Sequence, residues 1–243
     1  KAGIGKGHAP APHEPRHSAK HPKRRQPQSP IKEDPNSVRS RQDLLDDVPY
    51  QPMNTGLDES IANIGRINGI KGVDLVHNSD NVCGFGNGGK PRTYSAWLDE
   101  HKTTYVNSQG QTKIGHDWPP NDGYAGERKL SSFAEYASEH GVIVDRVGDP
   151  DGKFLGAVKD GRVASFEERG LPPASVHQPY YQYVFTGHMP EGWKIEHGIA
   201  ASWESECGGV RQLRILDELG SPVKISDLIK RGVLKGVEVP VGF

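Results

Sequence analysis

The chain has 243 residues, of which 33% are hydrophobic and 25% charged, and its formal net charge is −1; this length allows one domain with an appendage or two small domains. It contains no run of about 18 apolar residues, which excludes a membrane-spanning helix, and we expect no membrane partner. Its two cysteines, Cys83 and Cys207, are too few for a disulfide scaffold or a four-cysteine zinc site, and they leave open whether one disulfide joins them.

Residues 1–47 are predicted to form a flexible basic linker. Residues 1–30 hold seven Lys or Arg, four His, six Pro and one acid, Glu14, whereas the remainder is acidic by seven charges. Such a segment buries too little apolar surface to offset the entropy of ordering it. No aromatic residues alternate with its charges, so nucleic acid is not an expected partner. Because no initiator Met or signal-like stretch is present, we interpret the chain as the carboxy-terminal part of a longer polypeptide.

Residues 48–115 are expected to form a glycine-rich N-terminal extension or small subdomain, with short helices near residues 57–64 and 95–101. Residues 84–89 satisfy the spacing G-x-G-x-x-G of dinucleotide-binding turns. No clean buried strand precedes them, and Pro91 follows within two residues. We therefore interpret this segment as a glycine-rich loop.

Residues 116–243 show the pattern of an α+β domain. One amphipathic helix, closed by Gly141, is predicted from the helical spacing of Leu130, Phe133, Ala134, Tyr136 and Ala137. Short strands are predicted at residues 142–147, 153–158, 181–186, 199–203, 211–216 and 237–241, with a brief helix at 226–230 that Gly232 ends. Short strands with frequent turn signals favour a compact, mostly antiparallel sheet or barrel-like core with a few short helices.

Several motifs of this domain occur in a fixed order. They are W-P-P-N-D-G-Y at residues 118–124, D-R-V-G-D-P-D-G-K-F-L at 145–155, F-E-E-R-G-L-P-P at 166–173, P-Y-Y-Q-Y at 179–183 and G-G-V-R-Q-L at 208–213. In this order they resemble the tuberculosis necrotizing toxin family, whose domains hydrolyse NAD⁺ and occur at the ends of bacterial polymorphic toxins and in secreted fungal enzymes. The resemblance covers about half of the chain.

The resemblance implies that Arg146 and Gln212 are the catalytic residues and that Phe154 lines the nicotinamide pocket. Tyr181, which stands where some members carry His, is expected to offer a ring face to the substrate. Residues 205–207 and a pair of glycines replace a longer glycine run before Gln212. Trp203 and Glu206, close to Gln212 in sequence, are placed at the border of the substrate site.

These residue types suit cleavage of the bond between the ribose and the nicotinamide. Arg146 could clamp the pyrophosphate with its planar cationic fork, and the glycines Gly148 and Gly152 could bring backbone N–H groups to the same oxygens. Gln212 could orient a water molecule or the ribose hydroxyls without adding charge. Each residue also has a structural interpretation: Arg146 as the partner of a neighbouring aspartate, Gln212 as a sheet residue and Phe154 as core.

Two other classes of function stay open. Glu204 and Glu206 form an E-x-E pair of the kind that ADP-ribosyltransferases use to hold the ribose and activate an acceptor. A non-enzymatic binding module is the second alternative.

The resemblance implies a secreted toxin that acts in the cytosol of a target cell on NAD⁺ or NADP⁺. We expect no cofactor and no metal ligands among the site residues, and the sequence leaves open whether a bound metal stabilises the fold. It also implies a cognate immunity protein as a partner.

Overall fold

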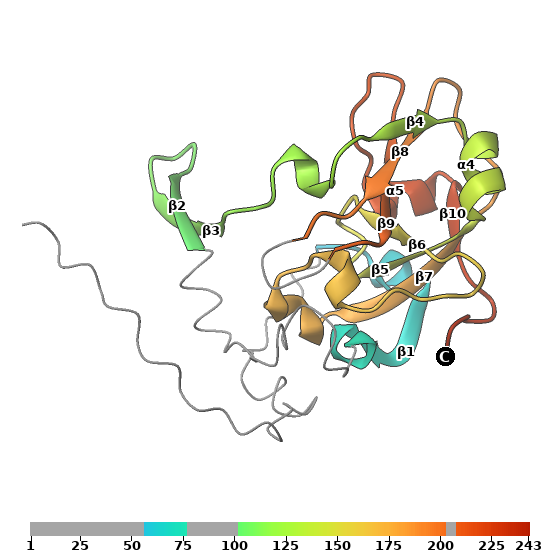
Figure 1. Cartoon of the computed structure of the whole chain (residues 1–243), viewed down its shortest axis with the longest axis horizontal. Helices are drawn as coiled ribbons and strands as arrows, with labels where there is room; N and C mark the ends of the chain where they lie inside the picture. Colours follow the sequence, from blue (N-terminus) through green and yellow to red (C-terminus); the bar gives the residue numbers. More distant parts are fainter. Residues whose placement is uncertain (1–55, 77–101, 203–207) are drawn as a thin grey trace, which may run out of the picture. The chain divides into compact units, whose positions relative to one another are not determined.

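The computed structural model describes residues 56–76, 102–202 and 208–243, and the core of this part is one eight-stranded sheet (Figure 1). Its strands are β1 (Arg66–Lys71), β4 (Lys129–Ser131), β5 (Ile143–Val147), β6 (Leu155–Ala157), β7 (Pro179–Phe185), β8 (Lys194–Ile199), β9 (Arg211–Leu216) and β10 (Leu234–Gly236). The order is β1-β7-β5-β6-β9-β8-β4, with β10 also on β7, and each of these pairings is antiparallel. The prediction of a mostly antiparallel α+β domain is confirmed.

Few and short helices accompany the sheet. They are α2 (Glu59–Ala62), α4 (Phe133–His140) and α5 (Ile225–Lys230), and a separate two-stranded hairpin consists of β2 (Lys102–Val106) and β3 (Thr112–His116). Within the described residues, no helix has the length and apolar character needed to cross a bilayer.

Helix α4 forms over most of the stretch that the apolar spacing predicted, but Leu130, expected in the helix, lies on β4 before it. Hydrogen bonds at its first turn and a glycine after its last residue explain where the helix begins and ends. The Ser132 side chain accepts from the Glu135 amide while the Glu135 side chain accepts from the Ser132 amide, which is a capping box. Gly141 ends the helix with a φ of 78°, a conformation that costs glycine little. The helix therefore begins and ends on signals that are local in sequence.

The two faces of the sheet bury different groups. On the helix face, Val144 and Leu213 pack with residues of α4 and α5 in the larger apolar cluster. On the opposite face, which we call the cavity face, Val147 and Tyr180 pack with Phe166 in a second cluster. The alternation of side chains along β5 explains this division, because successive residues point to opposite faces.

Three sequence predictions differ from the structure. The strand expected at residues 199–203 lies earlier in the chain: β8 runs from Lys194 to Ile199, and Ala200 after it makes only an isolated bridge. The strand expected at 237–241 does not form: Val241 bonds through its N–H and C=O to the side-chain amide of Gln182, and Pro240 has no N–H to donate to a ladder. Residues 66–71, expected in a separate extension, form β1 and pair with β7 of the main sheet.

Other predictions fall outside the described residues. These are the basic linker at 1–47, the helix at 95–101, the glycine-rich loop at 84–89 and both cysteines. The helix expected at 57–64 is present as α2 and begins after Asp58, whose carboxylate accepts from the Ser60 amide.

A buried histidine on β8 predicts how stability depends on pH. The Arg211 guanidinium can only donate, so it donates to Nδ1 of His197 (3.1 Å), and Nε2–H of the same ring donates to the Ser131 hydroxyl (2.9 Å). His197 is therefore neutral, and burial, with Arg211 and His140 beside the ring, lowers its pKa to about 4. Protonation would remove the acceptor that Arg211 uses.

The unfolded chain takes up this proton more readily than the folded chain, so we expect the free energy of unfolding to fall as the pH drops from about 6.5 to 4. The expected loss is on the order of 2 to 3 kcal/mol, measured by denaturant unfolding across that range. The His197→Gln variant should lose much less stability over the same range. If the variant loses as much unfolding free energy as wild type between about pH 6.5 and pH 4, the effect belongs to other titrating groups.

Candidate active site

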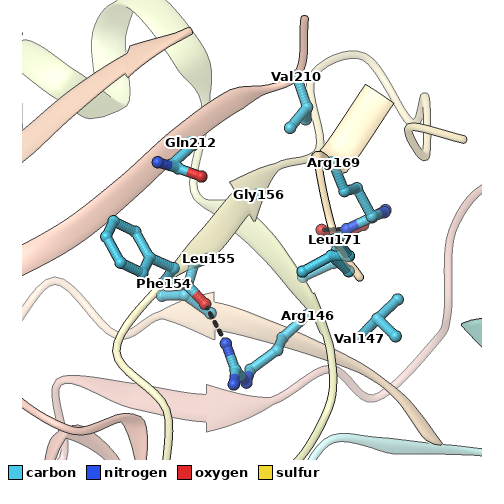
Figure 2. Close-up of a pocket in the computed structure, with 10 residues that line it drawn as sticks. Arg146, Val147, Phe154, Leu155, Gly156, Arg169, Leu171, Val210 and Gln212 are labelled. Carbon is cyan, nitrogen blue, oxygen red and sulfur yellow. Dashed lines mark hydrogen bonds and ion pairs between the residues drawn. The ribbon is translucent and has the colours of Figure 1, made fainter. Parts of the chain in front are cut away.

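The loop between β5 and β6 holds the guanidinium of Arg146. Its Nε donates to the Asp149 carbonyl (2.7 Å) and its Nη1 to the Phe154 carbonyl (2.8 Å), and Figure 2 shows the second bond as a dashed line. These two bonds fix the plane of the guanidinium against the loop. Burial lowers the pKa of Arg146 from its usual range, whereas the nearby Asp149 raises it; an arginine remains cationic under these opposing effects.

Gly152 leaves the space in which this guanidinium lies. A Cβ atom at residue 152 would be 1.9 Å from Arg146 Nη2 and 2.3 Å from Cζ, far closer than any non-bonded contact. Helix α5 in turn holds the loop, because the amides of Ile225 and Ser226 donate to the carbonyls of Gly152 (3.0 Å) and Pro150 (2.8 Å). The position of Arg146 therefore depends on a residue without a side chain.

The sequence analysis suggested that the two loop glycines bring free backbone N–H groups to the substrate. In the structure these N–H groups are not free. Gly148 N–H donates to the Pro179 carbonyl (3.0 Å), and Gly152 N–H is directed at the Asp149 carbonyl (3.4 Å). Both N–H groups are thus engaged within the protein: the Gly148 N–H ties the loop to β7, and the Gly152 N–H closes the turn of the loop itself. The contribution of these glycines is space for Arg146 at 152 and a left-handed turn at 148, where φ is 108°.

Gln212 stands between two glycines in the middle of the sheet. Its partner on β6 is Gly156 and its partner on β8 is Gly198, so no neighbouring side chain in its row covers it. Its Nε2 donates to the carbonyls of Gly123 (3.3 Å) and Asp122 (3.5 Å). The carboxamide therefore reaches over the sheet toward the W-P-P-N-D-G-Y segment.

A buried ion pair that the sequence analysis did not single out lies beside Gln212. Arg169 donates through Nη1 and Nη2 to the two carboxylate oxygens of Asp145, both at 2.7 Å, and Tyr180 donates its hydroxyl to Asp145 Oδ2 (2.7 Å). The Arg169 side chain is buried, and its Nε has no hydrogen-bond partner in the structure. The motif at 166–173 contains this arginine, but its partner Asp145 is 24 residues away and gives no local signal.

These groups surround one cavity of about 340 Å³, including its open mouth (Figure 2). The lining residues are Asp145, Arg146, Val147, Phe154, Leu155, Gly156, Arg169, Leu171, Val210 and Gln212. Three of the residues expected at the substrate site, Arg146, Phe154 and Gln212, therefore line the same cavity.

Strand register explains how residues of both sheet faces reach this cavity. Arg146 pairs with Tyr181 and points to the helix face, whereas Asp145 shares its row with Gln212 on the cavity face. β5 and β6 pair only at Val144 with Ala157 and at Asp145 with Gly156. The two strands separate beyond that point, and the opening lets Arg146 and Gln212 line one space.

The remaining predicted site residues have different outcomes. Tyr181 is fully buried, donates its hydroxyl to the Ala62 carbonyl (2.9 Å) and stacks on Tyr183, so its ring belongs to the core and presents no face to a ligand. Trp203 and Glu206, together with Glu204, lie outside the described residues. In the part of the chain that the structure describes, no three His, Cys, Asp or Glu side chains gather as a metal site requires.

Phe154 contacts one cationic side chain and one aromatic ring. The Arg214 guanidinium is 5.3 Å from the centre of its ring, and the Tyr124 ring meets it edge-on at 6.1 Å. Phe154 is half-buried, and these contacts fix its ring at the cavity wall.

Comparisons with known proteins find a matching family model, related sequences and a similar solved structure. Residues 139–237 match the family model described as tuberculosis necrotizing toxin. The outer membrane channel proteins CpnT of Mycobacterium tuberculosis and Mycobacterium bovis are 36% identical over 121 residues, which is 49% of this chain and 14% of those proteins. The chain therefore spans a small part of these curated relatives.

A solved structure is similar over most of its length. It is tuberculosis necrotizing toxin complexed with its immunity factor IFT; the TM-score is 0.59, the identity is 30%, and the match covers 77% of this chain and 90% of the solved chain.

Proposed function

The chain belongs to the tuberculosis necrotizing toxin family, and from this we propose that its toxin domain hydrolyses the N-glycosidic bond of NAD⁺ or NADP⁺. One observation supports the proposal above others: a guanidinium (Arg146), a carboxamide (Gln212) and a half-buried aromatic ring (Phe154) line the same cavity. Water is the co-substrate, and the reaction needs no cofactor.

The energetic barrier of this reaction lies in the ribose, not in the leaving group. Nicotinamide leaves with the electron pair of the C1′–N bond and becomes neutral, so no general acid has to protonate it. The ribose becomes an oxocarbenium-like cation, and water adds to C1′ and releases one proton. The balanced products are nicotinamide, ADP-ribose and H⁺.

Each residue has a role that its surroundings allow. Arg146, oriented by its bonds to Asp149 and Phe154, would hold the pyrophosphate as a fixed cationic fork. Phe154 would pack against the nicotinamide ring. Gln212 would hydrogen-bond an O–H group near C1′ without placing a full charge there.

The test is incubation of the chain with NAD⁺ alone, followed by chromatography of the products. We expect release of nicotinamide and ADP-ribose without any acceptor. Arg146→Ala and Gln212→Ala should each lower kcat/KM about a hundredfold, or about 3 kcal/mol of transition-state stabilisation, with folding checked by circular dichroism. Leu219→Ser, at a residue 85% exposed on the surface, is the control and should keep full activity.

Two results would contradict the proposal. Transfer of label from NAD⁺ to macromolecules of an added cell extract, with no free ADP-ribose released from NAD⁺ alone, would identify an ADP-ribosyltransferase. Full activity in both cavity variants would show that the reaction occurs elsewhere.

The partner and the site of action follow from the same proposal. The solved relative is a toxin bound to its immunity factor, and a cognate immunity protein would protect the producing cell by blocking this cavity. The domain would be secreted and would act in the cytosol of the target cell.

A further inference from the structure

The W-P-P-N-D-G-Y segment contains a turn with an uncommon backbone. Three successive residues are left-handed: Asn121 (φ 58°), Asp122 (φ 52°) and Gly123 (φ 78°). Residues with side chains avoid this region, although asparagine and aspartate tolerate it better than others. A turn of this kind persists only where surrounding contacts hold it.

The side chains of the turn supply part of the contacts that stabilise it. Asn121 donates through Nδ2 to the carbonyls of Tyr124 (3.1 Å) and Gly126 (2.7 Å). The Asp122 carboxylate accepts from Arg128 (2.7 Å) and Arg214 (3.0 Å), and the Arg128 bond is the main reason that the pKa of Asp122 is lowered.

The turn is also fixed to the sheet through its main chain. Ala201 N–H donates to the Gly123 carbonyl, and Ala125 N–H donates to the Ile199 carbonyl, both at 2.8 Å. Because Arg214 is on β9, two residues after Gln212, the turn is tied to the same strand as the predicted catalytic amide. Its carbonyl groups therefore have defined positions relative to Gln212.

These carbonyls determine which end of the Gln212 amide faces them. A carbonyl oxygen can only accept, so the NH₂ end of the carboxamide must face Asp122 and Gly123, and the reverse orientation would place oxygen against oxygen. In Figure 2 the oxygen of Gln212 accordingly lies on the side toward Gly156, a cavity-lining residue, and the nitrogen lies on the far side.

We propose that the Asn121–Gly123 turn is the positioning element of the site: its carbonyls hold Nε2 of Gln212 so that Oε1 faces the cavity. Gln212 then acts on the substrate as a hydrogen-bond acceptor. This inference rests on the proposed function for the identity of the donor, which is an O–H group of the attacking water or of the ribose. An amide oxygen there also places partial negative charge next to the developing ribose cation.

The decisive variant is Gln212→Glu, compared with Gln212→Met, which keeps the length and removes the polar atoms. At pH 8 an ionised carboxylate would face the two turn carbonyls, and we expect kcat/KM about a hundredfold below wild type. A protonated carboxyl group restores both a donor toward the turn and an acceptor toward the cavity. The activity of Gln212→Glu relative to wild type should therefore rise at least about tenfold between pH 8 and 5, while Gln212→Met stays at a constant low fraction.

The kinetic constants identify the donor. A fall in kcat with KM unchanged assigns it to the attacking water, and a raised KM assigns it to a ribose hydroxyl. A pH-independent ratio for Gln212→Glu, or full activity of this variant at pH 8, would overturn the acceptor role.

A stability measurement tests the contact without relying on catalysis. The melting temperature of Gln212→Glu should be lower than that of wild type at pH 8, and the gap should close toward pH 5 as the carboxylate is protonated. Equal melting temperatures at pH 8 would show that the turn does not hold residue 212. If wild type releases no nicotinamide, the proposed function fails, and this measurement still decides the contact.

A matched pair of variants tests the turn itself. Asp122→Ala removes the ionic hold on the turn, whereas Asp160→Ala changes another left-handed aspartate (φ 53°) that is not among the cavity-lining residues. We expect kcat to fall on the order of ten- to a hundredfold in the first variant, through misplacement of the amide, and to stay unchanged in the second. An equal loss in both would mean that the turn acts only through overall stability.

Discussion

Replacing Gly152 by alanine is expected to lower the proposed NAD⁺ hydrolysis about a hundredfold, although the change adds one methyl group and removes no functional group. The new Cβ would lie 1.9 Å from Arg146 Nη2, so the guanidinium has to leave its position. Its bonds to the Asp149 and Phe154 carbonyls would break. The Arg146→Ala variant sets the scale, since both changes remove the cation from the same place.

The measurement is steady-state nicotinamide release by both variants and by Gly56→Ala, where an added Cβ meets no atom within 4 Å. Because the displaced group is the far end of a flexible side chain, the Gly152→Ala protein should stay folded, as a melting curve can verify. Wild-type activity in Gly152→Ala would show that catalysis does not require Arg146 at its observed position.

Replacing Asp145 by asparagine is expected to cause the largest loss of stability, about 3 to 5 kcal/mol in the free energy of unfolding. Arg169 is buried and bonded to both carboxylate oxygens of Asp145, so the change leaves a buried cation without its counter-charge. Tyr180 also donates to this carboxylate. Denaturant unfolding followed by fluorescence measures the difference.

The surface pair of Arg162 with Glu168 provides the contrast. The Arg162 side chain is 67% exposed, and its replacement by glutamine should cost no more than about 1 kcal/mol. A double variant, Asp145→Leu with Arg169→Leu, should recover part of the stability lost in Asp145→Asn, because it removes both charges. A loss below 1 kcal/mol in Asp145→Asn would mean that water reaches Arg169.

Elements with local signals could be predicted from the sequence. β9 was predicted at its observed bounds from the apolar residues of Arg211–Leu216. Helix α4 was placed by its apolar spacing and by Gly141. Both rest on patterns within a few residues, which is the range in which periodicity and caps are informative.

Features that depend on distant pairing could not be predicted in the same way. β1 is a strand because it pairs with β7 more than 100 residues later, and its own sequence, R-I-N-G-I-K, has no clear alternation. Tyr181 was expected at the ligand because it stands where some family members carry His, but register places it opposite Arg146 within the core. Arg146, Phe154 and Gln212 were predicted as site residues from the motifs. The pairing of Asp145 with Arg169 could be recognised only in the folded structure.

The bonds between helix α5 and the β5–β6 loop have a consequence for synthesis of the chain. The loop emerges from the ribosome before α5, since Gly152 precedes Ile225 by more than 70 residues. Domains generally fold as units during translation, so a nascent chain that stops before residue 225 lacks the amides that lock the loop. Arg146 would thus reach its observed position only after translation of nearly the whole domain.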